Sequence, residues 1–390
     1  MKALVYFPSI PRYLLARAMG KRYPVGALPL RLAEVPEPEP PSGFVRVRVR
    51  LAGICGSDLA LLYGKNSPRL SPFFSFPAVL GHEILGEYAG TRVAVNPLLA
   101  CAERGLAPCP ACQRGEEGLC QNVAEGGLAP GMIGYHRELP GGWSEYVLAR
   151  PQRLVEIPAG VPDARAVLAE PLAVVLRGLR RAFAGGAGYA FPPAILVIGA
   201  GTIGLLTVRL LRALGFGGRL DVVARRRIQS ELAGAFGASG VYPSAAEALA
   251  AVGARRYRPI LGAPVWRGGY PAVVEAAGTP TSLDQAAWGA AEGGTVLLLG
   301  AAAETRHDFS PHWFSELTWV GSYTYAADDF ADAVALLPEL EGLERMVGGV
   351  YPLSAWPQAL RAAVRRRVVK AVFSPNPEPV PAGRLVPALT

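Results

Sequence analysis

The sequence predicts an α/β protein in which a doubly wound parallel sheet occupies the middle of the chain and a β-rich domain accompanies it. Three observations lead to this fold class. Residues 194–224 run strand, glycine turn, helix, strand. Residues 1 to about 150 contain short runs in which apolar and polar side chains alternate. The length of 390 residues exceeds what one hydrophobic core usually fills, which favours two domains.

The central region has the pattern of consecutive β-α-β units. The run A-I-L-V-I at 194–198 predicts a buried strand, and G-A-G-T-I-G at 199–204 predicts the turn into a helix that leads to the strand L-D-V-V-A. Strands that are buried on both faces of a parallel sheet have continuous apolar sequences. The next elements predicted on this basis are a strand at 272–274, a helix at 282–291 and a strand at 295–299.

The two ends of the chain have a different pattern. The run F-V-R-V-R-V-R-L at 44–51 alternates with a period of two, which predicts a half-buried strand, and the first third is expected to be mostly β. After about residue 311 the chain returns to short mixed elements, with a helix predicted at 328–337 and a strand at 368–373.

Composition excludes several classes of protein. With 51% hydrophobic and 18% charged residues and a mean hydropathy of +0.25, the chain is expected to be globular. The net charge of +8 is dispersed apart from 225–227 and 365–367, so a phosphorylated small molecule is a better partner than nucleic acid. The most apolar stretch, 194–208, is too short and too rich in glycine to span a membrane. The N-terminus has no secretion signal, so we expect a cytoplasmic protein.

The glycine turn predicts a dinucleotide site. Gly199, Gly201 and Gly204 permit a tight turn and close approach of a pyrophosphate, while Thr202 and Ile203 open the helix whose N-terminus faces it. A bare G-x-G-x-x-G is also compatible with a turn that serves only close packing. The flanking strand and helix favour the dinucleotide interpretation.

The end of the second strand indicates which dinucleotide binds. An acidic residue there bonds the ribose 2′-hydroxyl of NAD, whereas arginine accommodates the 2′-phosphate of NADP. Here the strand ends in Ala224, Arg225 and Arg226, and Asp221 falls too early to reach the ribose. We therefore predict NADP(H) in preference to NAD(H). The alternative is that the arginines form a solvated face, and that Asp221 or neither residue selects the cofactor.

Four cysteines, Cys101, Cys109, Cys112 and Cys120, fall within 20 residues. Cysteines in a reducing compartment are metal ligands or reactive thiols more often than disulfides. Four thiolates at such spacing predict a closed tetrahedral zinc site with a structural role. Redox thiols and a separate nucleic-acid-binding zinc module are the alternatives. The second is disfavoured because no basic and aromatic residues interleave nearby.

The remaining cysteine belongs to a different set of candidates. Cys55, His82, Glu83 and Glu170 each have an ordinary structural interpretation when taken alone, as a small buried side chain, a core histidine or a helix cap. Together they offer one thiolate, one imidazole and one or two carboxylates. Such a set holds zinc while leaving a position open for water or substrate.

These motifs resemble those of the zinc-dependent medium-chain dehydrogenase/reductase superfamily, which includes alcohol, polyol and threonine dehydrogenases. The resemblance covers nearly the whole chain. The matching motifs are M-K-A-L-V-Y at the start, G-I-C-G-S-D, G-H-E, the four cysteines, G-G-W-S-E-Y-V at 141–147, A-E-P-L-A-V at 169–174, G-A-G-T-I-G, V-V-E-A-A-G-T at 273–279 and V-K-A-V at 369–372.

The resemblance implies a domain arrangement. A GroES-like catalytic domain would comprise residues 1–172 and 312–390, with a zinc lobe at about 97–122, and a Rossmann domain would comprise 173–311. The resemblance also implies assembly as a homodimer or homotetramer.

The resemblance further implies residue roles. Cys55 and His82 would be catalytic zinc ligands, Glu83 and Glu170 would complete or exchange within the ligand set, and Ser57 would bond the alcohol oxygen and begin a proton relay. Two zinc ions per chain follow. Glu170 stands where short-alcohol dehydrogenases usually have cysteine, which favours the polyol, sugar or threonine branch.

The predicted function is therefore that of a zinc-containing, NAD(P)-dependent alcohol or polyol dehydrogenase. It would transfer a hydride between nicotinamide and an alcohol or polyol, or the matching aldehyde or ketone. Two other readings are a zinc-free NADPH-dependent enone or quinone reductase and a noncatalytic binding protein, against which the four candidate ligands argue. A nucleic-acid-binding zinc protein rests on charge and the cysteine spacing alone. We expect no nucleic-acid or membrane partner.

Overall fold

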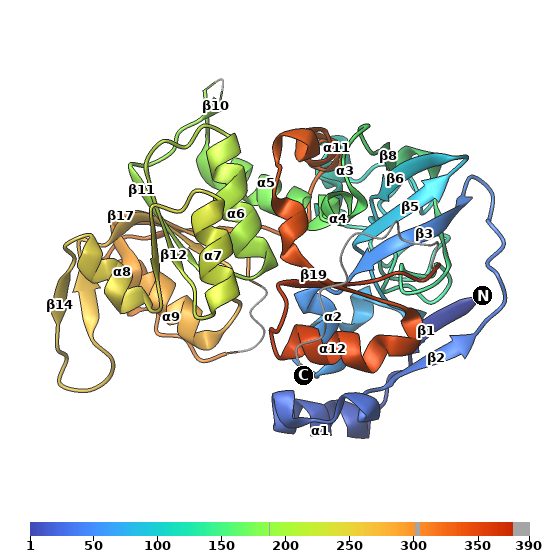
Figure 1. Cartoon of the computed structure of the whole chain (residues 1–390), viewed down its shortest axis with the longest axis horizontal. Helices are drawn as coiled ribbons and strands as arrows, with labels where there is room; N and C mark the ends of the chain where they lie inside the picture. The colour runs from blue at the N-terminus through green and yellow to red at the C-terminus, as the bar shows by residue number, and fades with distance from the viewer. Residues whose placement is uncertain (187, 301–304, 377–390) are drawn as a thin grey trace.

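The computed structural model describes residues 1–186, 188–300 and 305–376. Its strands form two large sheets, which Figure 1 shows side by side. The six-stranded sheet takes all its strands from residues 194–321, and the seven-stranded sheet takes its strands from both sides of that segment. The predicted fold class, a doubly wound parallel sheet with a β-rich partner, is confirmed.

The six-stranded sheet is parallel throughout and has the order β13-β12-β11-β16-β17-β18. Its strands are β11 (Ala194–Ile198), β12 (Arg219–Val223), β13 (Gly240–Tyr242), β16 (Tyr270–Glu275), β17 (Ala290–Leu298) and β18 (Thr318–Gly321). The order reverses between β11 and β16. In sheets of this kind, ligands bind beyond the carboxyl ends of the strands at such a switch point.

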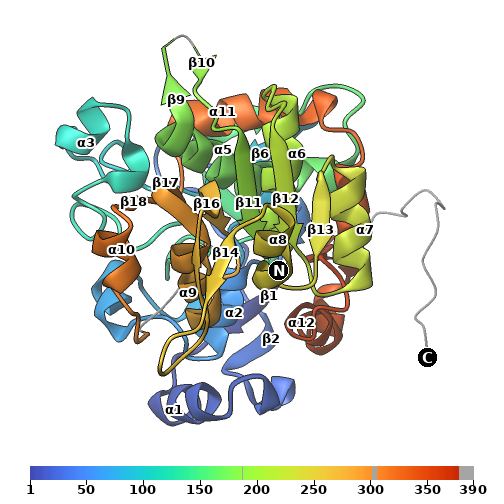
Figure 2. The same ribbon diagram turned by 90° about the vertical axis from the view of Figure 1, so that its left-hand side faces the viewer.

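Helices cover both faces of this sheet, which Figure 2 views from its outer end. They are α5 (Ala169–Phe183), α6 (Thr202–Ala213), α7 (Arg227–Ala235), α8 (Ala245–Ala251) and α9 (Pro280–Gly289). Alternate residues of β11 face opposite sides: Ile195 and Val197 pack in one apolar cluster with α5 and α6, whereas Leu196 and Ile198 pack in another with α8 and α9. Burial on both faces explains the continuous apolar sequences.

Strand β3 (Val45–Gly53) organises the seven-stranded sheet. It pairs with β5 (Ile84–Tyr88), β7 (Tyr146–Ala149) and β20 (Lys370–Phe373), all antiparallel. The other strands of this sheet are β6 (Thr91–Val95), β8 (Leu154–Glu156) and β19 (Val347–Tyr351). In the register of β3 with β20, Val372 lies opposite Gly53. Segments far apart in the chain therefore meet where β3 ends.

The predicted elements of the central region are present to within a few residues, but the first third contains a helix that was not expected. Helix α1 (Ile10–Met19) follows Ser9, has proline in its first turn and ends at Gly20, which are ordinary start and stop signals. The abundance of Pro and Gly in the first 150 residues hides this helix when composition is averaged.

Shorter elements complete the chain. They are β1 (Lys2–Tyr6), β2 (Leu30–Glu34), α2 (Gly56–Leu62), β4 (Ala78–Val79), α3 (Pro110–Gln113), α4 (Asp163–Ala166), β9 (Ala184–Gly185), β10 (Gly188–Tyr189), β14 (Arg255–Tyr257), β15 (Val265–Arg267), α10 (Ser310–Phe314), α11 (Ala327–Leu336) and α12 (Trp356–Val364). Among the described residues, no helix has the length and apolarity needed to cross a bilayer. The boundaries 1–172, 173–311 and 312–390 stay a proposal, and residues 377–390 of the last range lie outside the described part.

Candidate active site

Three of the predicted ligands meet where β3 ends. Cys55 is the residue before α2, and His82 and Glu83 directly precede β5, the antiparallel partner of β3. One ligand atom from each of these three side chains lies within 4.8 Å of the others. A thiolate, an imidazole and a carboxylate at this spacing have the donor chemistry that zinc prefers, so these residues fit a zinc ion.

His82 is held by residues of the α2 segment. Its Nε2 lies 3.4 Å from Ser57 Oγ, and its Nδ1 lies 3.4 Å from Oδ1 of the fully buried Asp58. Asp58 also accepts a hydrogen bond of 2.9 Å from the Cys55 backbone N–H and one of 3.0 Å from the Tyr135 hydroxyl. Burial alone would lower the pKa of His82, but the Asp58 carboxylate raises it well above its usual value.

Sequence reasoning missed Asp58 and Tyr135. Asp58 belongs to the motif G-I-C-G-S-D, and the spacing of three residues from Cys55 is that of a helix cap, a signal that was available. Tyr135 lies 77 positions from Asp58, and nothing in its surroundings in the sequence marks it. Its hydroxyl is 3.1 Å from Ser57 Oγ, so it connects the two side chains beside His82.

Glu83 forms a buried ion pair that the sequence analysis did not anticipate. The Lys370 ammonium on β20 donates to both carboxylate oxygens, at 2.7 and 2.6 Å, and the two side chains are 2% and 1% exposed. Burial works to lower the pKa of Lys370, but the charge of Glu83 raises it. Glycine is required at position 53, because a Cβ there would overlap the Glu83 carboxylate.

Glu170 lies near this cluster but outside the group of three. It is in the first turn of α5 and is 5% exposed, and its carboxylate is not among the atoms within 4.8 Å of one another. Burial raises the pKa of Glu170 to about 7; the charge of His82 opposes the rise and that of Glu83 adds to it. The structure therefore brings Cys55, His82 and Glu83 together and places Glu170 in their electrostatic neighbourhood.

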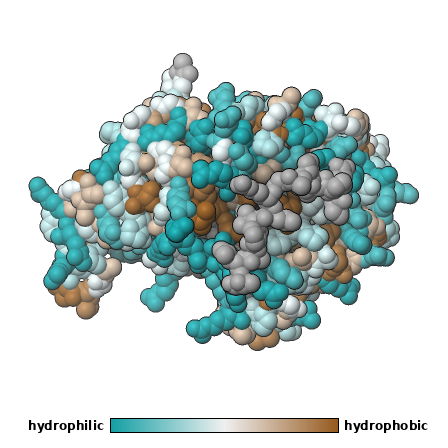
Figure 3. Space-filling view, in the orientation of Figure 1, coloured by the Kyte–Doolittle hydropathy of each residue, from teal (hydrophilic) through white to brown (hydrophobic). Residues whose placement is uncertain are grey.

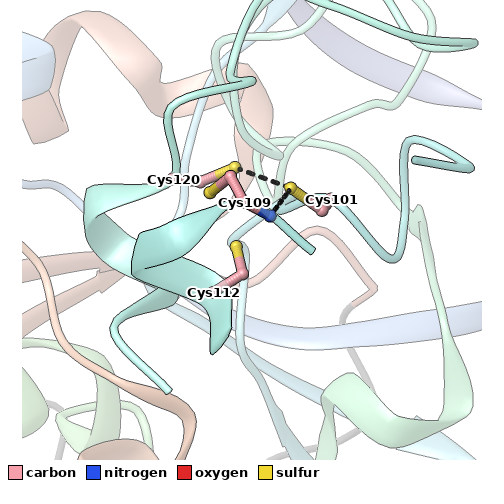
Figure 4. Close-up of side chains that lie close together, drawn as sticks. All are labelled: Cys101, Cys109, Cys112 and Cys120. Carbon is pink, nitrogen blue, oxygen red and sulfur yellow. Dashed lines mark hydrogen bonds between the residues drawn. The ribbon is translucent and has the colours of Figure 1, made fainter. Parts of the chain in front are cut away.

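The four cysteines of the lobe also meet. One sulfur from each lies within 4.8 Å of the others, and Figure 4 shows the sulfur atoms of Cys101, Cys109, Cys112 and Cys120 around a common centre. All four are free of disulfides. The thiols accept hydrogen bonds from the backbone, for example from Gln121 N–H to Cys109 Sγ at 3.4 Å. Four sulfur donors so arranged fit a tetrahedral structural zinc ion.

The lobe is attached to the rest of the molecule through buried charges. Arg153, 4% exposed, donates two hydrogen bonds of 3.0 and 2.8 Å to Glu103 and pairs with Glu117 as well. Next to Glu117, Gly118 packs so closely against Thr324 that a Cβ there would overlap the Thr324 hydroxyl. The lobe therefore contacts the segment beside Tyr325. Burial raises the pKa of Tyr325, and the charge of Glu170 raises it further, so this segment adjoins the cluster around Cys55.

The predicted dinucleotide turn has the expected geometry. It connects β11 to α6, Gly199 has a positive φ of 105°, and Gly201 is the extended residue before the helix, with open space at its Cβ position. A Cβ on Gly204 would overlap the Gly199 carbonyl oxygen. These features leave room for a phosphate at the first turn of α6, where Thr202 and Ile203 begin the helix.

The residues predicted to choose the cofactor follow β12. Ala224 is buried, whereas Arg225 and Arg226 are exposed at the start of α7. Asp221 is fully buried in the strand, where it accepts hydrogen bonds of 2.7 Å from Arg219 and 2.6 Å from the Tyr270 hydroxyl. It is therefore engaged within the fold, away from the end of the strand.

The dinucleotide turn and the cluster around Cys55 are connected through one short segment. The Thr202 hydroxyl donates a hydrogen bond of 3.3 Å to the carbonyl oxygen of Val369, and the next residue, Lys370, pairs with Glu83. The first turn of α6 therefore lies beside the strand that supplies the cation bound to Glu83.

The structure has the three features that define the class of zinc-type dehydrogenases. They are a doubly wound domain with a glycine turn, a mixed cluster of cysteine, histidine and glutamate, and a four-cysteine lobe. Two family models match the chain and agree with this class. Residues 41–159 match the alcohol dehydrogenase GroES-like domain, and residues 202–339 match the zinc-binding dehydrogenase domain. The chain belongs to the zinc-type medium-chain alcohol and polyol dehydrogenase superfamily.

Individual relatives agree with this assignment. The chain is similar to L-galactonate-5-dehydrogenase of Escherichia coli K12, 35% identical over 46% of this chain and 48% of the relative, and to D-altritol 5-dehydrogenase of Agrobacterium fabrum C58, 34% identical over 47% and 52%. The aligned part thus spans about half the length of these curated relatives. A zinc-binding dehydrogenase from Sinorhizobium meliloti 1021 bound to NADP has a similar crystal structure, with 29% identity, a TM-score of 0.68 and coverage of 89% of this chain and 95% of that chain.

Proposed function

We propose that the protein is a zinc-dependent dehydrogenase that transfers a hydride between NADP(H) and a hydroxyl-bearing carbon of a polyol or sugar-derived substrate. The observation that carries this proposal is the convergence of Cys55, His82 and Glu83 beside the segment that contacts the dinucleotide turn. Two relatives are dehydrogenases of L-galactonate and D-altritol, which favours a substrate with several hydroxyl groups. The buried Glu170 at the edge of the cluster agrees with that branch.

Each group of the site has a distinct task in this proposal. Cys55 and His82 hold zinc, with Glu83 or Glu170 as the carboxylate ligand, and zinc supplies Lewis-acid polarisation of the substrate oxygen. During oxidation Ser57 Oγ accepts the proton of the substrate hydroxyl while its own proton passes to the Tyr135 hydroxyl, 3.1 Å away. The Tyr135 proton moves in turn to Asp58 Oδ1, at 3.0 Å, and reduction reverses these transfers. Asp58 keeps the His82 ring in place.

The cofactor is bound by the other half of the molecule. Gly199, Gly201 and Gly204 let the pyrophosphate approach the N-terminus of α6. Arg225 and Arg226 are available for a 2′-phosphate, and Asp221 does not compete because its carboxylate is bound by Arg219 and Tyr270. The preference for NADP(H), two zinc ions per chain and a homodimer or homotetramer remain parts of the proposal.

The decisive experiment combines metal analysis with turnover. We expect about two zinc ions per purified chain, and oxidation of polyols or sugar acids that stops when a chelator removes zinc. Cys55→Ala should lose one zinc ion and turnover while retaining NADPH binding. The matched control, Cys109→Ser, should also lose one zinc ion but retain the zinc at Cys55. Full activity of Cys55→Ala, or a single zinc ion held only by the lobe, would contradict the proposal.

A further inference from the structure

The segment between β1 and β2 brings a lysine to the edge of the dinucleotide site. Helix α1 packs against the loop that follows α2: the Tyr13 hydroxyl donates a hydrogen bond of 3.0 Å to the Asn66 carbonyl oxygen, and Gly64 lies close against Tyr13 and Arg17. The short 3-10 helix Gly20–Arg22 continues from α1. This packing holds Lys21 close to the α2 loop and its Lys65.

Two further cations reach the same place from other elements. The turn after α12 includes Arg366, which has a positive φ of 53° and is held by a hydrogen bond from its backbone N–H to the Ala363 carbonyl oxygen. Three residues later, Val369 accepts the hydrogen bond from Thr202 at the start of α6. Helix α7, which packs against α6, begins directly after Arg226. The turn after α12 is thus attached to the part of the nucleotide domain that carries the Arg226 side chain.

The chain that follows Lys21 packs on α12 through the 3-10 helix Val25–Ala27, so the Lys21 segment lies beside the helix that ends in the Arg366 turn. The residues that converge here from four segments, called the cross-domain cation cluster, are Lys21, Lys65, Arg226 and Arg366. Partial burial is the main cause that lowers the pKa of Lys21, and the charges of Arg366, Lys65 and Arg226 lower it further. All four residues are exposed, and none forms an ion pair with another residue in the described part of the chain. In the view of Figure 3, hydrophilic residues cover α7 and the left-hand end of α1 below it.

Like charges that are held together without a carboxylate repel one another, which costs stability unless an anion binds among them. The Arg226 side chain is at the end of β12, where the adenosine ribose of a dinucleotide is placed in this kind of fold. A 2′-phosphate carries nearly two negative charges near neutral pH and offers several acceptor oxygens. It is thus the anion that best matches cations at this end of the cofactor.

We propose that the cross-domain cation cluster binds the 2′-phosphate of NADP(H), with Lys21 of the β1–β2 segment as a specificity-determining residue contributed by the domain opposite Arg226. This inference rests on the proposed function, because it assumes a nicotinamide dinucleotide at the glycine turn. The inference adds that the choice between NADP(H) and NAD(H) depends on both halves of the molecule, and not only on the residues that follow β12.

Binding without turnover tests the inference. We would measure, by calorimetry on the full chain, the affinities of 2′,5′-ADP, 5′-AMP, NADPH and NADH for the wild type, Lys21→Gln and the matched control Arg22→Gln. Arg22 is the exposed neighbour of Lys21 on the same 3-10 helix and is absent from the cluster. Lys21→Gln should weaken 2′,5′-ADP and NADPH by about tenfold, the change expected from one lost charge-assisted hydrogen bond. It should change 5′-AMP and NADH less than about twofold, within the small variation of exposed sites.

The other outcomes are equally informative. If Lys21→Gln binds 2′,5′-ADP as the wild type does, or weakens all four ligands equally, the assignment of the 2′-phosphate to this cluster is wrong. Either result would leave the proposed dehydrogenase standing as long as zinc-dependent turnover is seen. Arg22→Gln should match the wild type; a tenfold loss in that variant as well would show that the effect is general charge and would overturn the role of Lys21. Raising the salt concentration should reduce the difference in 2′,5′-ADP affinity between wild type and Lys21→Gln, because salt screens the attraction between the Lys21 ammonium and the 2′-phosphate.

Discussion

The buried ion pair between Glu83 and Lys370 provides a quantitative test of the site. Replacing Lys370 with methionine keeps most of the side-chain volume but removes the ammonium that contacts both oxygens of Glu83. The Glu83 carboxylate is 1% exposed, so bulk solvent does not hydrate it, and the like charge of the nearby Glu170 adds to the cost of leaving it unpaired. Removal of one member of a buried pair costs about 3–5 kcal/mol of unfolding free energy, and we expect that loss for Lys370→Met without metal.

A double-mutant cycle separates the charge from the change of shape. Lys370→Met combined with Glu83→Gln leaves no uncompensated charge, so this double variant should recover most of the stability lost in Lys370→Met. We expect a coupling energy between the two positions of at least about 2 kcal/mol, which is within the range for contacting residues. The measurement is urea unfolding of metal-free protein, followed by tryptophan fluorescence. A loss below about 1 kcal/mol in Lys370→Met, the level of an exposed pair, would refute the reasoning.

Added zinc makes the same variants report on which glutamate is the ligand. If Glu83 binds the ion, the ion compensates the charge that Lys370 no longer neutralises, and zinc should reduce the stability deficit of Lys370→Met. If Glu170 is the ligand, the deficit should persist with zinc, and Glu170→Gln should lower zinc affinity more than Glu83→Gln does. The two carboxylates, both buried beside His82, are thereby distinguished without reference to turnover.

Three other expectations concern the lobe and the surrounding core. Cys109→Ser should reduce the zinc content by one ion per chain and make the lobe sensitive to limited proteolysis, whereas unchanged zinc content would exclude it as a ligand. Gly118→Ala introduces a methyl group that overlaps the Thr324 hydroxyl, so it should cost about 1–3 kcal/mol in urea unfolding, while Gly217→Ala, with nothing within 4 Å of its Cβ position, should not. Burial lowers the pKa of His136 to about 4, below its unfolded value, so stability should fall by up to about 3 kcal/mol as pH drops from 6.5 to 4. His136→Gln should show a shallower dependence on pH, and an identical slope would refute the assignment.

The parts of the site that sequence alone predicts are those encoded by local spacing. The four cysteines of the lobe lie within 20 residues, and G-A-G-T-I-G lies between a strand and a helix, so short-range rules are sufficient to propose both. The strands of the parallel sheet are equally local, because burial on both faces gives continuous apolar runs such as 194–198.

The parts that sequence reasoning missed depend on contacts between distant segments. Lys370 was recognised as part of V-K-A-V, but its pairing with Glu83 spans 287 positions, and no spacing rule connects the two. Tyr135 reaches Asp58 across 77 positions for the same reason. The first contact exists because β3 pairs with both β20, which begins at Lys370, and β5, which directly follows Glu83. Partner identity of this kind follows from sheet topology, which a single sequence specifies only through the complete fold.

One segment of the chain carries contacts to all three parts of the proposed site. Within five residues, Arg366 belongs to the cation cluster, Val369 accepts the hydrogen bond from Thr202 at the dinucleotide turn, and Lys370 neutralises Glu83 beside the candidate zinc ligands. Any movement of the two halves relative to each other must displace this segment, since it is attached to both. We therefore expect zinc binding and dinucleotide binding to be thermodynamically coupled, so that each increases or decreases the affinity for the other by the same factor. Calorimetric titration of NADPH into zinc-loaded and zinc-depleted protein measures that factor, and identical affinities would show that the segment transmits no coupling.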